Sequence, residues 1–123
     1  MKHLIILRVH YKFIKMEKSE IRLVEIPTAG GHEQSGMRPA IVLSEVESGI
    51  VIIIPFTSNP QALRFPHTID VNPSVENGLN SRSIALVFQM RAIDKRRIKN
   101  KIGTIEGKTM EKIDEMIKEI LHL

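Results

Sequence analysis

Two short polar clusters carry the residue types that chemistry at a phosphate would need. The first, Gly31–Pro39, reads Gly-His-Glu-Gln-Ser-Gly-Met-Arg-Pro and leads into an apolar run. The second, Pro55–Asn59, places two hydroxyl groups directly after a β-branched run. A guanidinium can hold two oxygens of one phosphate in a fork, and a hydroxyl at a rigid strand end can hold a phosphate or a developing oxyanion. These clusters are therefore the candidate active centre.

Composition alone leaves a simpler interpretation of both clusters open. Polar loops usually lie on the surface, so Arg38 can simply pair with Glu33 in a solvated loop. Ser and Asn are common in turns, which accounts for Ser58 and Asn59. On composition, the solvated loop is the better interpretation of Gly31–Pro39.

Several other kinds of site find no support in the sequence. The chain has no cysteine, which excludes disulfides, thiolate catalysis and cysteine-based zinc sites and fits a reducing compartment. The five histidines lack the i,i+4 partner or carboxylate cluster of a metal site, and no glycine-rich phosphate loop occurs. We therefore expect no metal and no cofactor. Aromatic residues make up only 4%, which argues against a stacking-rich platform for single strands.

The charge is modestly basic, with a formal net charge of +4. Such an excess is compatible with a polyanionic partner such as RNA. The segment Arg91–Lys101 holds six Lys and Arg residues against the single acid Asp94. It is interpreted either as a guide for RNA or as a solvated helical turn.

Short runs of strand type precede one helix. Apolar alternation or β-branched residues predict strands at Ile21–Ile26, Ala40–Leu43, Ile50–Ile54, His67–Val71, Ser83–Phe88 and Gly103–Ile105. Loops are predicted at Pro27–Pro39, Asn59–Pro66 and Asn72–Arg82, with Pro55 ending a strand and Asp94 capping a helical turn at Lys95–Ile98. Thr109–Leu123 has an apolar stripe at helical spacing, with Thr109 as its N-cap. This order predicts a mainly β protein, a small barrel or sandwich, with a C-terminal α-helix.

The chain has the length of one domain. Met16 opens a cleaner beginning than Met1, so we expect Met1–Lys15 to be an N-terminal extension or an upstream start, and residues 16–123 to be the domain. No segment approaches the length of a membrane span, so we expect a soluble protein.

Taken together and in order, the polar clusters resemble the MazF/PemK toxin family over Ile21–Leu123. The residues that carry this resemblance form three ordered motifs: Pro27-Thr28, Gly31, Glu33-Gln34, Gly36 and Arg38-Pro39; Pro55 with Thr57-Ser58-Asn59; and Ser83–Gln89 with Arg91, Asp94, Arg97, Ile98 and Gly103. Two positions depart from the family pattern. Ser19-Glu20 stands where Gly-Asp is usual, and Phe88 stands where an Asp often precedes the Gln of the third motif.

The resemblance implies a small SH3-like β-barrel with a C-terminal helix, the MazF/CcdB-like toxin fold, acting as a homodimer in the cytoplasm. It implies the toxin of a type II toxin–antitoxin system, an mRNA interferase. Its reaction would be metal-independent cleavage of single-stranded mRNA by attack of the 2′-hydroxyl on the neighbouring phosphorus. A cognate antitoxin with an acidic, partly disordered tail is the expected partner.

The resemblance also implies roles for particular residues. Arg38 matches the catalytic arginine and Thr57 the catalytic threonine. The residues expected to line the groove for RNA and antitoxin are Glu33, Gln34, Ser58, Gln89, Arg64 and His32. Because a guanidinium is a poor base, His32 is a local alternative for proton transfer.

Two alternatives remain at this point. One is a non-enzymatic toxin of the CcdB type, which acts on DNA gyrase and shares the fold without the Glu-Gln-x-Gly-x-Arg-Pro loop. The other is a degenerate barrel that only binds RNA or a partner.

Overall fold

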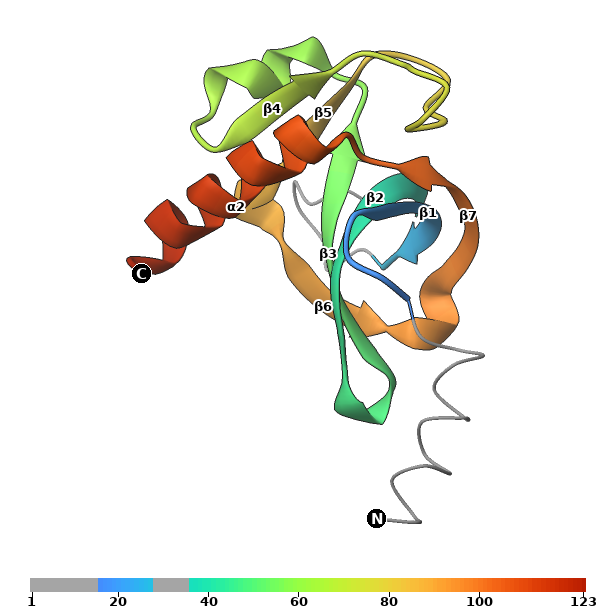
Figure 1. Ribbon diagram of the computed structural model, residues 1–123. Helices are drawn as coiled ribbons and strands as arrows, with labels where there is room; N and C mark the ends of the chain where they lie inside the picture. The colour runs from blue at the N-terminus through green and yellow to red at the C-terminus, as the bar shows by residue number, and fades with distance from the viewer. Residues whose placement is uncertain (1–15, 28–35) are drawn as a thin grey trace.

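The computed structural model describes residues 16–27 and 36–123, in which seven strands precede one C-terminal helix (Figure 1). The strands are β1 (Glu20–Ile26), β2 (Gly36–Val46), β3 (Ile50–Thr57), β4 (Thr68–Val71), β5 (Ser83–Leu86), β6 (Arg91–Asp94) and β7 (Ile98–Thr104), and the helix is α2 (Gly107–Leu121). Short 3₁₀ turns occur at η1 (Glu47–Gly49), η2 (Pro60–Arg64), η3 (Val87–Gln89) and η4 (Lys95–Arg97). The predicted extension Met1–Lys15 lies outside the described residues.

All strand pairs are antiparallel and follow the order β4-β5-β3-β2-β1-β7, with β6 added on β3. Among the described residues the two end strands, β4 and β7, do not pair with each other, so the sheet is curved but open. The predicted fold class, mainly β with a C-terminal helix, is confirmed.

The central strands are buried on both faces. On one face Ile41 of β2 and Ile54 of β3 pack with Met110 and Ile113 of α2. On the other face, alternate residues of the same strands pack against residues of β6 and β7; this second cluster includes Ala40, Val42, Val51, Ile53, Ile93 and Ile98. The run Ile50–Ile54 is β-branched without alternation, which predicts a fully buried strand; the strand is confirmed, but only Val51, Ile53 and Ile54 are buried, while Ile50 and Ile52 are half-buried.

Helix α2, coloured red in Figure 1, runs along one side of the sheet. The apolar stripe predicted for it packs on the core. The predicted N-cap Thr109 is wrong, because the helix begins two residues earlier with Glu106 at the cap. The carbonyl of Glu106 already accepts the first helical hydrogen bond, from the N–H of Met110 at 2.9 Å.

Several strand boundaries also differ from prediction. Strand β2 begins at Gly36, so Arg38 and Pro39 lie on a strand rather than in the predicted loop. Pro55 lies inside β3 rather than at its end. It is tolerated there because β3 changes partner at this point, pairing with β6 up to Ile53 and with β5 from Phe56.

The later strands were also predicted incompletely. Strand β6 was missed, β7 starts at Ile98 rather than Gly103, and β5 ends at Leu86 in a 3₁₀ turn. The sequence of β6, Arg-Ala-Ile-Asp, has little strand character of its own. It is ordered by pairing with the buried strand β3.

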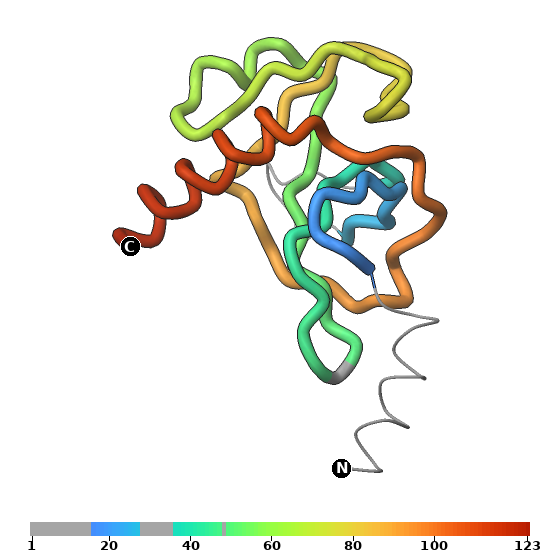
Figure 2. Tube along the Cα trace, in the orientation of Figure 1, coloured from blue at the N-terminus to red at the C-terminus, as the bar shows by residue number. Residues whose placement is uncertain are grey.

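The segment from Asn72 to Arg82 lies against the end of β7, where the Thr104 N–H donates to the carbonyl of Glu76 at 2.9 Å; these segments are the yellow and orange tubes of Figure 2. Gly78 has a positive φ of 67°, and a Cβ added there would collide with the carbonyl of Ile102. A Cβ added at Gly103 would collide with the backbone of Asn77. The two backbones therefore touch because both positions are glycine, and we call this contact the glycine clamp.

We predict that Gly78→Ala lowers the free energy of unfolding by about 3 kcal/mol or more, because it adds both a backbone collision and an unfavourable φ. Chemical denaturation measures this change. The matched control is Gly107→Ala, since a Cβ there meets nothing within 4 Å at the start of α2 and is expected to be neutral or stabilising. Equal stabilities of the two variants would contradict the clamp.

Candidate active site

Arg38 and Thr57 come together where strands β2 and β3 separate. The last recorded pair of these strands is Ala40 with Pro55. Continuing the same register by two residues places Arg38 opposite Thr57, and residues directly opposite in an antiparallel pair share a face. Pro39 has no N–H to extend the ladder, so the strands part and leave a space between these two side chains.

This space is a cleft of about 400 Å³. One side is formed by β2 with Arg38, another by the end of β3 with Thr57 and Ser58, and the third by residues 78–81 and Ser83. Arg38 and Thr57 were predicted to form the candidate centre, and the structure places both in this cleft. We call it the Arg38–Thr57 cleft.

The hydroxyl group of Thr57 is buried and already accepts one hydrogen bond. The residue is 6% exposed, and its Oγ1 accepts a hydrogen bond from the backbone N–H of Asn59 at 3.2 Å. Because the oxygen is already used as an acceptor, the hydroxyl proton remains available to donate to a ligand in the cleft.

The third wall of the cleft is held by a buried amide. Asn77 is fully buried; its Oδ1 accepts from the backbone N–H groups of Ser74 and Leu79, both at 3.0 Å. Its Nδ2 donates to the carbonyl of Asn72 at 2.9 Å and to the Glu106 carboxylate at 3.2 Å. The sequence predicted only a loop at Asn72–Arg82 and gave no role to Asn77; the one signal was its place directly before Gly78.

The Glu106 carboxylate is stabilised in its charged form by the same wall. Burial raises the pKa of Glu106, but hydrogen bonds from the Ser74 hydroxyl, its own backbone N–H and Asn77 outweigh this and lower the pKa below the usual value. The wall of the cleft and the start of α2 are therefore joined through one ionised group.

A second depression of about 500 Å³ shares Thr57 with the cleft. Arg64 and Gln89, two of the predicted groove residues, line this depression and not the first. Phe65 and Phe88 line it as well; neither was predicted as a site residue, and the low aromatic content gave no sign of their proximity. We call this depression the aromatic pocket.

The remaining predicted groove residues are placed as follows. Ser58 lies in the Arg38–Thr57 cleft with an exposed side chain. His32, Glu33 and Gln34 lie outside the described residues. Their predicted roles stay predictions.

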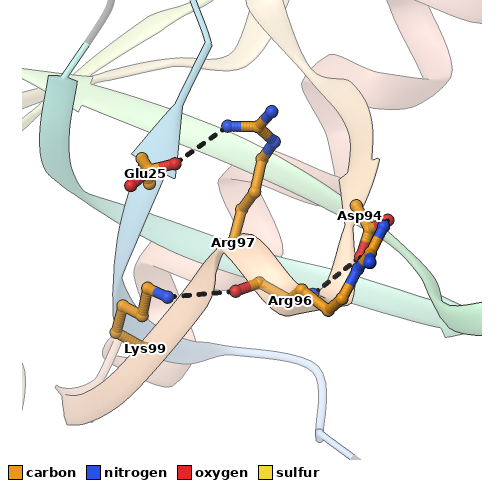
Figure 3. Close-up of polar contacts among 5 residues, drawn as sticks. All are labelled: Glu25, Asp94, Arg96, Arg97 and Lys99. Atoms are coloured by element: carbon orange, nitrogen blue, oxygen red, sulfur yellow. Dashed lines mark hydrogen bonds and ion pairs between the residues drawn. The ribbon is translucent and has the colours of Figure 1, made fainter.

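The basic segment Arg91–Lys101 forms the run β6–η4–β7, in which the predicted helical turn is the 3₁₀ turn η4 (Lys95–Arg97) between two strands. Figure 3 shows that much of its charge is paired: Arg97 with Glu25 at 2.9 Å, and Arg96 with Asp94 at 2.8 Å. The hydrogen bond from Arg96 lowers the pKa of Asp94 to about 2. As predicted, Asp94 also caps the turn, accepting from the N–H of Arg96. These pairs reduce the charge that the segment offers to RNA.

No group of three or more His, Asp or Glu side chains in residues 16–27 and 36–123 is placed to hold a metal ion. Within the same residues, no helix is long and apolar enough to cross a membrane.

Residues 17–121 match the family described as PemK-like, MazF-like toxin of type II toxin–antitoxin system. The chain is similar to endoribonuclease EndoA of Bacillus subtilis, with 26% identity over 112 residues that cover 88% of this chain and 96% of EndoA.

Two solved structures share the fold. MazF of Deinococcus radiodurans superposes with a TM-score of 0.74 at 19% identity, covering 88% of this chain and 97% of that one. An endoribonuclease from Mycobacterial species, solved in complex with its cognate antitoxin, superposes with a TM-score of 0.64 at 15% identity, covering 88% and 94% of the two chains.

We predict that the stability of the wall depends on pH through Glu106. Because its pKa is lowered on folding, its contribution is complete above the ordinary glutamate value and is lost as the pH falls through the lowered one. Glu106→Gln should lower the free energy of unfolding by about 1–3 kcal/mol at pH 7, with a deficit that shrinks towards pH 3. Denaturation at a series of pH values measures this.

The control for this experiment is Glu115→Gln on the exposed side of α2, where the side chain is 72% exposed. It should follow the parent at every pH. A Glu106→Gln deficit that stays constant with pH would show that the carboxylate charge does not hold the wall.

Proposed function

This chain belongs to the PemK-like, MazF-like toxin family of type II toxin–antitoxin systems, and we propose that its Arg38–Thr57 cleft is the active centre of a metal-independent endoribonuclease. The observation that carries the proposal is the shared cleft itself: an arginine and a threonine, 19 positions apart in the sequence, face one space from two strands. Endoribonuclease is also the activity named for the Bacillus subtilis relative.

The proposed reaction is cleavage of single-stranded mRNA by its own 2′-hydroxyl. The 2′-oxygen bonds to the adjacent phosphorus and the bond from phosphorus to the 5′-oxygen breaks, which leaves a 2′,3′-cyclic phosphate and a 5′-hydroxyl. One proton leaves the 2′-hydroxyl and one reaches the departing 5′-oxygen. No atom is consumed from water or metal in this step.

Arg38 and Thr57 stabilise the charge that builds on the phosphoryl oxygens. A guanidinium offers parallel N–H donors that match two such oxygens. The Thr57 hydroxyl, whose oxygen already accepts from Asn59, donates one more hydrogen bond. Both groups are held by strands before substrate arrives, which is the condition for large electrostatic stabilisation of a transition state. Arg38 itself and His32 are the two candidates for proton transfer.

The remaining expectations also belong to this proposal. We propose that the protein acts in the cytoplasm, forms a homodimer, and is neutralised by a cognate antitoxin that covers the cleft. The Mycobacterial endoribonuclease was solved in complex with its cognate antitoxin. An acidic antitoxin tail would suit a groove that contains Arg38 and Arg64.

We predict that the purified protein cleaves single-stranded mRNA in the presence of EDTA. Arg38→Ala and Thr57→Val should each reduce the cleavage rate by about 100- to 1000-fold, because each removes a preorganised donor. Thr57→Ser, which keeps the hydroxyl, should retain most of the activity. Single-turnover cleavage of a labelled RNA measures these rates, with circular dichroism as the check on folding.

Arg82→Ala is the matched control for loss of an arginine. Arg82 pairs with Asp70 at 2.7 Å on an exposed surface and does not line the cleft, so the variant should cleave RNA at the parental rate. Cleavage only after addition of metal, or gyrase inhibition without RNA cleavage, would contradict the proposal. The second result would instead support a toxin of the CcdB type.

A further inference from the structure

The aromatic pocket begins where the Arg38–Thr57 cleft ends, because Thr57 lines both. An RNA strand whose scissile phosphate lies at Thr57 must therefore place a neighbouring nucleotide at this pocket. The volume of about 500 Å³ is within the usual range for small-ligand sites.

Two phenylalanine rings at this pocket are left uncovered. Phe65 is 43% exposed and Phe88 is 39% exposed, whereas Phe56, the other phenylalanine in the described residues, is 1% exposed in the core. The centroids of the Phe65 and Phe88 rings are 5.6 Å apart at an interplanar angle of 46°. The two rings thus form a tilted pair with free surface, which is the geometry that an unpaired base can stack against.

The charge at the pocket suits a polyanion. The Arg64 guanidinium carbon lies 4.9 Å from the centroid of the Phe65 ring, a cation–π contact. No acidic residue lines the pocket. A nucleotide can therefore bring its phosphate close to Arg64 without facing a like charge.

Two amide side chains at the pocket are available for base edges. Gln61 and Gln89 make no side-chain hydrogen bond to any residue in 16–27 or 36–123. Carboxamides pair well with the donor and acceptor edges of unpaired bases.

The turn that carries Gln61 and Arg64 is rigidly held. Asn59 accepts from the N–H of Gln61 at 3.0 Å and so caps η2. Ala62 packs on Ile84 and Leu86 of β5. The pocket is therefore formed before any ligand binds.

We propose that the aromatic pocket binds the base of a nucleotide that adjoins the scissile phosphate. The base stacks on Phe88 and Phe65, and Gln61 and Gln89 contact its edge. Arg64 holds the adjoining phosphate. This inference rests on the proposed function.

The test compares loss of the base with loss of the ring. The cleavage position is first mapped on mRNA. Short single-stranded RNAs are then made with the base removed, as an abasic ribose, on either side of the scissile phosphate. For the parent protein, base removal at one of these two positions should lower kcat/KM by about 5- to 150-fold, the range expected for one stacked base.

The variant Phe88→Leu keeps an apolar side chain but loses the ring. It should lose a similar factor on the intact RNA and less than about twofold more on the abasic RNA, because the two changes remove the same contact. Phe65→Leu should behave in the same way with a smaller loss. The matched control is Leu63→Ala on the same turn, since Leu63 is 38% exposed but does not line the pocket; it should keep the full parental sensitivity to base removal.

The possible failures are distinguishable. If the parent cleaves no RNA, the proposed function fails and this inference falls with it. If the parent cleaves RNA but Phe88→Leu stays as sensitive to base removal as the parent, only the inference is overturned. If Phe88→Leu instead changes the molecular mass measured by light scattering, the rings belong to an interface with a second copy, which also overturns it.

Discussion

The antiparallel register between β2 and β3 is the constraint on which both the core and the candidate site depend. The same ladder that pairs Ile41 with Ile54 leads, a few residues on, to the facing positions of Arg38 and Thr57. Side chains alternate between faces along a strand. A slip of one residue would therefore move Ile41 off the face of α2 and turn Arg38 away from the cleft at once. The packing of the core and the candidate site therefore depend on the same β2–β3 ladder. The two strands separate at Pro39, where this ladder ends, and the cleft lies there.

The elements that could be predicted from the sequence are those with local causes. The β-branched run Ile50–Ile54, the apolar stripe of α2 and the cap at Asp94 each follow from residues a few positions apart. The elements that could not be predicted depend on distant partners. Strand β6 is ordered by pairing with β3, and the residues of β2 before Arg38 are ordered by pairing with β1. Helix α2 begins at Gly107 because Ser74 and Asn77 hold the carboxylate of Glu106. Asn77 lies 29 residues before Glu106 in the sequence.

The candidate site shows the same division. Arg38, Thr57 and Ser58 were found from motif order and lie in one cleft. Composition, however, reports how many aromatic and basic residues a chain has and not where they lie. Only 4% of the residues are aromatic, yet Phe65 and Phe88 lie together beside Thr57. In the most basic segment, Arg97 and Arg96 form ion pairs with Glu25 and Asp94. Only the three-dimensional structure shows that the few aromatic side chains are clustered and that many of the basic ones are paired.

The glycine clamp has a consequence for the order in which the site is completed during synthesis. Arg38, Thr57 and the wall residues that follow Asn77 leave the ribosome first, since chains are made from the N-terminus and fold as they emerge. The partners that fix this wall, Ile102, Gly103 and Glu106, are made later. A nascent chain thus carries Arg38 and Thr57 before the third side of their cleft is complete. For a toxin translated from an mRNA, a wall that is completed only after residue 106 has been made separates the synthesis of the candidate residues from the completion of their cleft.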